Sequence, residues 1–96
     1  PKRDPQLREF KVVAKRYAFS PSRLEVDHGD IVRITLTTED IPHTLTIDRF
    51  RVSKRATRDR AATIEFVADT PGTYVFYCSL TTENGCRTMR GELVVR

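Results

Sequence analysis

Four side chains that can bind a soft metal are spread unevenly along this chain of 96 residues. Both cysteines, Cys78 and Cys86, and the only methionine, Met89, lie in one stretch near the C-terminus, between two apolar segments. Sulfur ligands together with imidazole suit copper, and Cu(I) above all. A loop that a rigid sheet holds at both ends is a suitable place for such ligands. The candidate imidazole, His43, lies far upstream, so the fold must bring it to the sulfurs.

Segments in which apolar and polar residues alternate predict a β-sheet protein. The clearest is residues 31–38, where Val32, Ile34 and Leu36 share one face. The other predicted strands are bounded by turn residues and cover residues 10–19, 23–27, 43–47, 62–67, 73–78 and 92–96. The first of these loses its alternation at Lys15-Arg16, which predicts a bulge. Seven short strands without a convincing helix predict an all-β, antiparallel Greek-key sandwich.

The chain is long enough for one domain with one buried core. Residues 1–8 are charged and bounded by prolines, so we expect a tail there and a single domain over residues 9–96. No apolar run is long enough to span a membrane, and no signal-peptide pattern is visible. Because the chain begins with Pro1 rather than Met, we expect a trimmed fragment, for which a membrane tether upstream of residue 1 stays open.

Basic residues outnumber acidic ones by 17 to 13, which gives a net charge of +4. The excess gathers in one connection, at Arg49, Arg51, Lys54, Arg55, Arg58 and Arg60. A nucleic-acid surface would carry aromatic residues among these charges, and only Phe50 is there, so we expect no nucleic-acid partner. Two interpretations remain for the cluster: a solvated loop, or a docking patch for an acidic redox partner or a membrane surface.

Alternation places His43 and Cys78 on inward-facing rows, with His43 at the start of its strand and Cys78 at the end of its own. In antiparallel neighbours these two positions can meet at one end of the sandwich. Cys86 and Met89 then approach from the loop that follows Cys78. The other histidine, His28, lies roughly 25 Å from that end, because a strand rising about 3.3 Å per residue separates the two. We therefore expect His28 to be a turn residue near the opposite end.

The row PGTYVFYC is followed by Cys86-x-x-Met89-x-Gly91 near the C-terminus. In these residues the sequence resembles the cupredoxins, and more closely the CuA domain of cytochrome c oxidase subunit II and nitrous oxide reductase. That family holds its ligands as Cys-x3-Cys-x3-His-x2-Met. Cys78, Thr82, Cys86 and Met89 fall at those four positions without a gap.

The upstream part of the chain matches the family pattern too, because His43 is followed seven residues later by Phe50-Arg51-Val52. Two positions depart from it. Thr82 stands where the family has its second bridging cysteine, so the resemblance does not imply the usual two-copper cluster. Cys86 stands where the family has its second histidine. The family also uses a backbone carbonyl two residues after its first cysteine, here that of Leu80.

The resemblance thus implies one copper ion, Cu(I) or Cu(II), bound by His43, Cys78 and Cys86 with Met89 as a weak or axial ligand. Glu83 and the Leu80 carbonyl are possible additional ligands. The implied function is electron transfer or copper handling, in a periplasmic or other extracytoplasmic place. The implied partner is a redox protein or a copper donor or acceptor.

A second interpretation stays open. Cys78 and Cys86 would form a disulfide or a redox-active pair in a copper-free structural or interaction domain. We expect no enzyme, because the chain shows no serine–histidine or paired-carboxylate arrangement, and two histidines leave little for acid–base chemistry. It could still be the electron-transfer domain of an oxidase.

Overall fold

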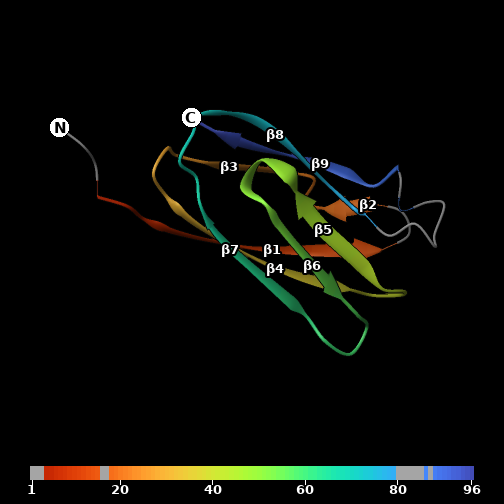
Figure 1. Ribbon diagram of the computed structural model, residues 1–96. Helices are drawn as coiled ribbons and strands as arrows, with labels where there is room; N and C mark the ends of the chain where they lie inside the picture. Colours follow the sequence, from red (N-terminus) through yellow and green to blue (C-terminus); the bar gives the residue numbers. More distant parts are fainter. Residues whose placement is uncertain (1–3, 16–17, 80–85, 87) are drawn as a thin grey trace.

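The computed structural model describes residues 4–15, 18–79, 86 and 88–96, and these form two β-sheets packed face to face (Figure 1). The first sheet has the order β2-β1-β4-β7, with β1 (Leu7–Lys15), β2 (Ala18–Ser20), β4 (Ile31–Thr38) and β7 (Ala62–Val67). The second has the order β3-β9-β8-β5-β6, with β3 (Arg23–Val26), β5 (His43–Ile47), β6 (Val52–Ala56), β8 (Gly72–Tyr77) and β9 (Arg90–Val95). The predicted all-β sandwich is confirmed, with nine strands in the described part of the chain rather than about seven.

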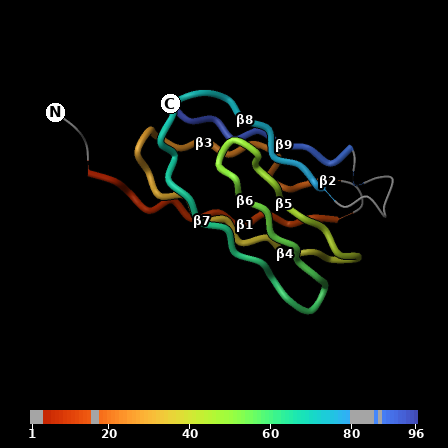
Figure 2. Tube along the Cα trace, in the orientation of Figure 1, coloured from red at the N-terminus to blue at the C-terminus, as the bar shows by residue number. Residues whose placement is uncertain are grey.

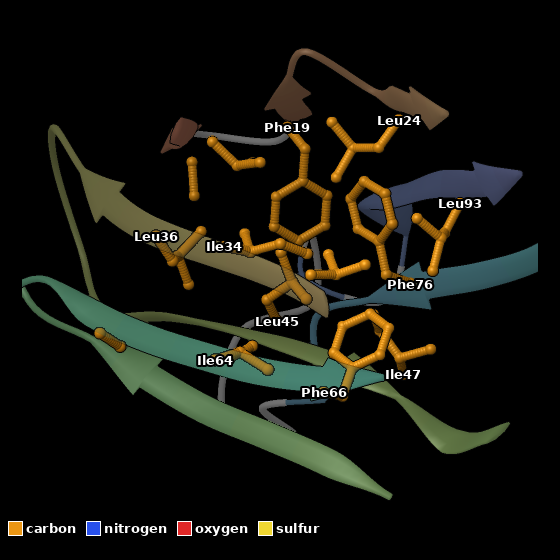
Figure 3. Packing of buried hydrophobic residues seen from close by; sticks show 14 of the residues in the cluster. Phe19, Leu24, Ile34, Leu36, Leu45, Ile47, Ile64, Phe66, Phe76 and Leu93 are labelled. Carbon is orange, nitrogen blue, oxygen red and sulfur yellow. The ribbon is translucent and has the colours of Figure 1, made fainter. Parts of the chain in front are cut away.

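The hydrophobic core lies between the sheets and consists of the inward rows that the alternation predicts (Figure 3). Ile34 and Leu36 of the first sheet are fully buried, as are Phe76 and Leu93 of the second. The rings of Phe19 and Phe76 meet edge to face across the core, with centroids 5.2 Å apart. Burying one such side chain contributes about 1.5–3 kcal/mol to folding, so the inward rows hold the two sheets together.

Residues 10–19 form two strands rather than the one strand predicted, and Arg16 of the predicted bulge lies outside the described residues. β1 and β2 are antiparallel neighbours, with Lys15 opposite Ala18 and Ala14 opposite Phe19. Ala14 and Phe19 are both buried, so each strand contributes an inward residue, but Phe19 is out of step with the row of Val12 and Ala14.

The basic connection also contains a strand that the sequence did not predict. A short 3-10 helix, η1 (Asp48–Phe50), leads into β6, which pairs along its length with β5. β6 is the edge of the second sheet, and only Ala56 of its five residues is buried. A strand that buries so little shows no alternation of apolar residues, and charged residues are common on edge strands.

The sandwich is not wholly antiparallel, which corrects that part of the prediction. β1 runs parallel to β4, and β3 runs parallel to β9. Each parallel pair joins segments that are distant in sequence, so no tight hairpin requires them to be antiparallel.

His28 lies where it was expected, in the turn before β4. Its N–H donates to the carbonyl of Arg96 at 3.0 Å, so it sits at the end of the sandwich where the chain ends (Figure 2). No helix of the described residues is long and apolar enough to cross a membrane.

Candidate metal site

His43 is the first residue of β5, and its side chain is fully buried. Its Nε2 lies 3.0 Å from Oδ1 of Asp40, whereas its Nδ1 is buried without a hydrogen-bond partner. An ionised carboxylate only accepts hydrogen bonds, so the ring hydrogen belongs on Nε2 and the lone pair on Nδ1. A neutral imidazole with one nitrogen on a carboxylate and a lone pair on the other is the form that binds metals.

Asp40 is held in place by the connection between β4 and β5. Its Oδ1 accepts from the N–H of Ile41 at 2.6 Å, and its own N–H donates to Oγ1 of Thr38 at 3.4 Å. The Thr38 hydroxyl in turn donates to the carbonyl of Ile41 at 2.6 Å. The carboxylate therefore sets the orientation of the His43 ring. Asp40 was not among the residues predicted from the sequence, where its signal is an acid three residues before the candidate ligand.

The three sulfur-bearing residues lie close together where β8 ends and β9 begins. Cys78 directly follows β8, and a disulfide joins it to Cys86. The N–H of Cys78 donates to the carbonyl of Met89 at 3.3 Å. The N–H of Met89 donates to the carbonyl of Cys86 at 3.1 Å. Cys78 is 3% exposed, and Cys86 and Met89 are 0% exposed. Both cysteines of the sequence are in this disulfide.

The strand ends that carry His43 and Cys78 are neighbours. β5 and β8 are antiparallel, with Thr46 opposite Tyr77. Thr44, the residue after His43, accepts from the N–H of Ser79 at 2.7 Å, and its Oγ1 lies 3.8 Å from Sγ of Cys78. The predicted meeting of the two strand ends is thus present.

These donors fit copper only in part while the disulfide is closed. His43 offers a buried lone pair and Met89 a thioether, but disulfide sulfurs lack the thiolate charge that binds a metal. Among the described residues, no group of three or more histidine, cysteine, aspartate and glutamate side chains is arranged to hold an ion. Thr82 and the possible ligands Leu80 and Glu83 lie outside the described residues.

Comparison with known proteins gives relatives in sequence and several structures with the same fold. Nitrous-oxide reductase of Stutzerimonas stutzeri is 32% identical over 83 residues, which cover 82% of this chain and 12% of that protein. The chain thus spans about an eighth of that relative's length. The periplasmic domain of cytochrome oxidase subunit II (CoxB) of Bradyrhizobium japonicum has the same fold, with a TM-score of 0.81, 18% identity, and coverage of 100% of this chain and 86% of that one. Auracyanin A, a "blue" copper protein of Chloroflexus aurantiacus, has a TM-score of 0.77 and 16% identity over 94% of this chain and 99% of its own.

A further structure with the same fold is subunit II of cytochrome c oxidase in a mixed disulfide intermediate with the thioredoxin-like protein TlpAs. It has a TM-score of 0.75 and 18% identity over 100% of this chain and 84% of its own. The family model described as a cupredoxin-like domain matches residues 1–95. This match confirms the resemblance to cupredoxins inferred from the sequence. The chain belongs to the cupredoxin-like domain family.

Proposed function

We propose that this domain binds one copper ion when its cysteines are reduced, and that the Cys78–Cys86 disulfide is its metal-free, oxidised state. The observation that carries the proposal is the buried Nδ1 of His43, which has no hydrogen-bond partner. A buried polar atom left unsatisfied costs about 1–3 kcal/mol, and a metal ion would satisfy it. The carboxylate of Asp40 on the other ring nitrogen supports this, because metal-binding histidines commonly have such a partner.

The ligands in this proposal are His43, Cys78 and Cys86, with Met89 as a weak or axial ligand. Copper would supply one-electron chemistry, for electron transfer or for copper handling. Two thiolates carry more negative charge than the single thiolate of a blue-copper site, which favours Cu(II) and lowers the reduction potential relative to that site. Two thiols can also reduce Cu(II) and hold Cu(I), so the proposal covers both oxidation states.

Opening the disulfide requires two electrons and two protons, which a dithiol protein can supply while its own cysteines become a disulfide. The mixed disulfide between a thioredoxin-like protein and a domain of the same fold supports a partner of this kind. Disulfides persist outside the cytoplasm, and a related fold occurs in a periplasmic domain, so we place this domain there, with a membrane tether upstream of residue 1 as part of the proposal.

The cationic edge strand supports an acidic redox partner or copper donor. In the β5–β6 pairing, Ala56 lies opposite His43 and Arg55 opposite Thr44. A partner with an acidic surface that docked on β6 would therefore sit one strand away from the proposed copper ligand. Charge complementarity of this kind raises the association rate and makes it sensitive to salt.

Copper titration tests the proposal directly. Reduced wild-type protein should take up one equivalent of copper, whereas the oxidised protein and reduced His43→Ala should bind far more weakly. Cys86→His restores the second imidazole of the family pattern and removes the disulfide, so it should develop an intense thiolate-to-Cu(II) absorption without prior reduction. Reduced wild-type protein that takes up no copper would exclude the proposal.

The buried disulfide itself favours a second candidate function, a copper-free domain stabilised by that bond. In this case the bond is structural, and the unpaired nitrogen of His43 has no metal-binding role. Thiol counting on metal-free protein treated with a dithiol reductant separates the two candidates. The copper site requires that two thiols appear while the fold persists, whereas a structural disulfide would stay closed until the domain unfolds.

A further inference from the structure

Four hydroxyl groups on the outer face of the second sheet form a continuous hydrogen-bonded chain that ends at a disulfide sulfur. Ser53 on β6 lies 2.8 Å from Thr46 on β5, and Thr46 lies 3.1 Å from Ser79. Ser79 lies 3.0 Å from Thr44, whose Oγ1 is 3.8 Å from Sγ of Cys78. The first three distances each join two hydroxyl oxygens, and the last joins a hydroxyl oxygen to a sulfur. Thr44 and Thr46 are both buried, so water does not compete freely for their hydroxyls.

One assignment of the hydroxyl hydrogens makes every donation run toward Cys78. Thr44 then donates to the sulfur and Thr46 donates to Ser79. Either atom can be the donor in the other two pairs, and each hydroxyl has a single hydrogen, so in this assignment Ser79 donates to Thr44 and Ser53 donates to Thr46. Hydrogen bonds aligned in this way polarise one another, and their combined dipole favours negative charge on the sulfur at the end of the chain.

We propose that this hydroxyl chain selects Cys78 as the sulfur that carries the charge when the disulfide opens. The thiolate of a dithiol reductant attacks Sγ of Cys86 and forms a mixed disulfide with it. The Cys78–Cys86 bond breaks, and its electron pair goes to Sγ of Cys78, which the hydroxyl of Thr44 stabilises. The second thiol of the reductant then displaces Cys86, so the reductant leaves as a disulfide and its two protons balance the two new thiols.

Exposure does not decide between the two sulfurs, because both side chains are almost completely buried. The stability of the leaving thiolate decides instead which sulfur is attacked, because thiol–disulfide exchange is faster when the departing thiolate is more stable. A hydrogen bond to a charged sulfur is roughly twice as strong as one to a neutral group, so Thr44 contributes more as the bond breaks than in the disulfide. This inference shares its cysteine pair with the proposed copper site, but it requires only that the disulfide can be reduced.

The test measures the rate of reduction of metal-free, oxidised protein by dithiothreitol. Thr44→Val removes the hydroxyl, and we expect about a tenfold slower reduction, the factor that corresponds to about 1.4 kcal/mol. Thr44→Ser keeps a hydroxyl and should stay close to wild type, and Thr46→Val should lie in between. Thr63→Val, the same change at an exposed position in the other sheet, is the matched control. Loss of structure alone would loosen the site and speed reduction, so only a slower rate supports the proposal.

A second measurement identifies the attacked sulfur. Wild-type protein is treated with glutathione, the reaction is stopped by alkylation, and peptide mass spectrometry locates the glutathione. We expect it mainly on Cys86 in the wild type and on both cysteines in Thr44→Val. Glutathione mainly on wild-type Cys78, or a Thr44→Val variant that matches Thr63→Val in both measurements, would overturn the inference. Neither measurement uses copper, so failure here is distinct from failure of the copper site.

Discussion

Replacing Asp40 with alanine tests whether this carboxylate positions His43. In the structure, Oδ1 of Asp40 is the acceptor for Nε2 of His43, and it also accepts from the N–H of Ile41. Nδ1 of the same ring already lacks a partner, so the substitution leaves both nitrogens of a fully buried imidazole without one.

The expected magnitude follows from that burial. An unsatisfied buried donor costs about 1–3 kcal/mol, so the free energy of unfolding of the metal-free domain should fall by about that amount in Asp40→Ala. Loss of the hydrogen-bonding partner of a metal-binding histidine typically lowers metal affinity by about 10–100-fold. Reduced Asp40→Ala should therefore bind copper about 10–100-fold more weakly than the wild type.

Urea unfolding measures the first effect, and competition with a Cu(I) chelator measures the second. Asp40→Asn keeps a side-chain oxygen that can accept from Nε2, so it should lose less in both assays. Glu39→Ala removes a neighbouring exposed carboxylate and serves as the control for charge alone. If Asp40→Ala and Glu39→Ala behave alike, then Asp40 does not position the ring.

Three further predictions concern the scaffold. Reduction of the metal-free disulfide should lower the free energy of unfolding by about 2.5 kcal/mol, because the bond closes a loop between cysteines eight positions apart; urea unfolding with and without a reductant measures this. Gly91→Ala should destabilise the domain by about 1–3 kcal/mol in the same assay, because the new Cβ would overlap the ring of Phe76. The O–H of Tyr77 donates to Asp48, and this hydrogen bond raises the pKa of Tyr77 above its usual value; in Asp48→Asn the pKa should fall back, as followed by tyrosinate absorbance.

The raised pKa of Tyr77 makes the free energy of unfolding depend on pH. Because the pKa of Tyr77 is raised in the folded state, the hydrogen bond to Asp48 stabilises the fold below the usual tyrosine pKa of about 10, and this contribution is lost as the pH rises through the raised value. The stability difference between wild type and Asp48→Asn should therefore shrink at alkaline pH. Tyr77→Phe identifies which part of the absorbance change belongs to this residue. For Gly91→Ala and for the reduced disulfide, an unchanged unfolding midpoint would contradict the packing and loop-closure arguments.

The sequence predicted the strands that have one face in the core and missed those that do not. β4 and β7 alternate cleanly because every second residue is buried. β6 escaped prediction because its pairing with β5 uses the backbone, and its exposed side chains leave no periodic signal. The division into β1 and β2 was not predicted because the break in alternation after Ala14 was interpreted as a bulge within one strand.

The sequence also predicted that the strand ends carrying His43 and Cys78 are neighbours, but not the chemical state of the cysteines. Cysteine sulfurs close enough to share a metal are also close enough to bond to each other, so spacing alone left both interpretations open. The structure has the bonded form of Cys78 and Cys86. Asp40 and the hydroxyls beside Thr44 escaped prediction because short polar residues in connections and on outer faces carry no periodic pattern. The role of Thr44 also depends on contacts with a segment more than 30 residues away, as with Ser79.

The burial of β5 on both of its faces has a consequence for how firmly the fold holds His43. All five of its residues are buried, and β6 and β8 flank it in the sheet. Strands of this kind open only in global unfolding, so their amides exchange with deuterium most slowly. In the proposed copper-bound state, His43 would therefore be held by a strand that opens only when the whole domain unfolds.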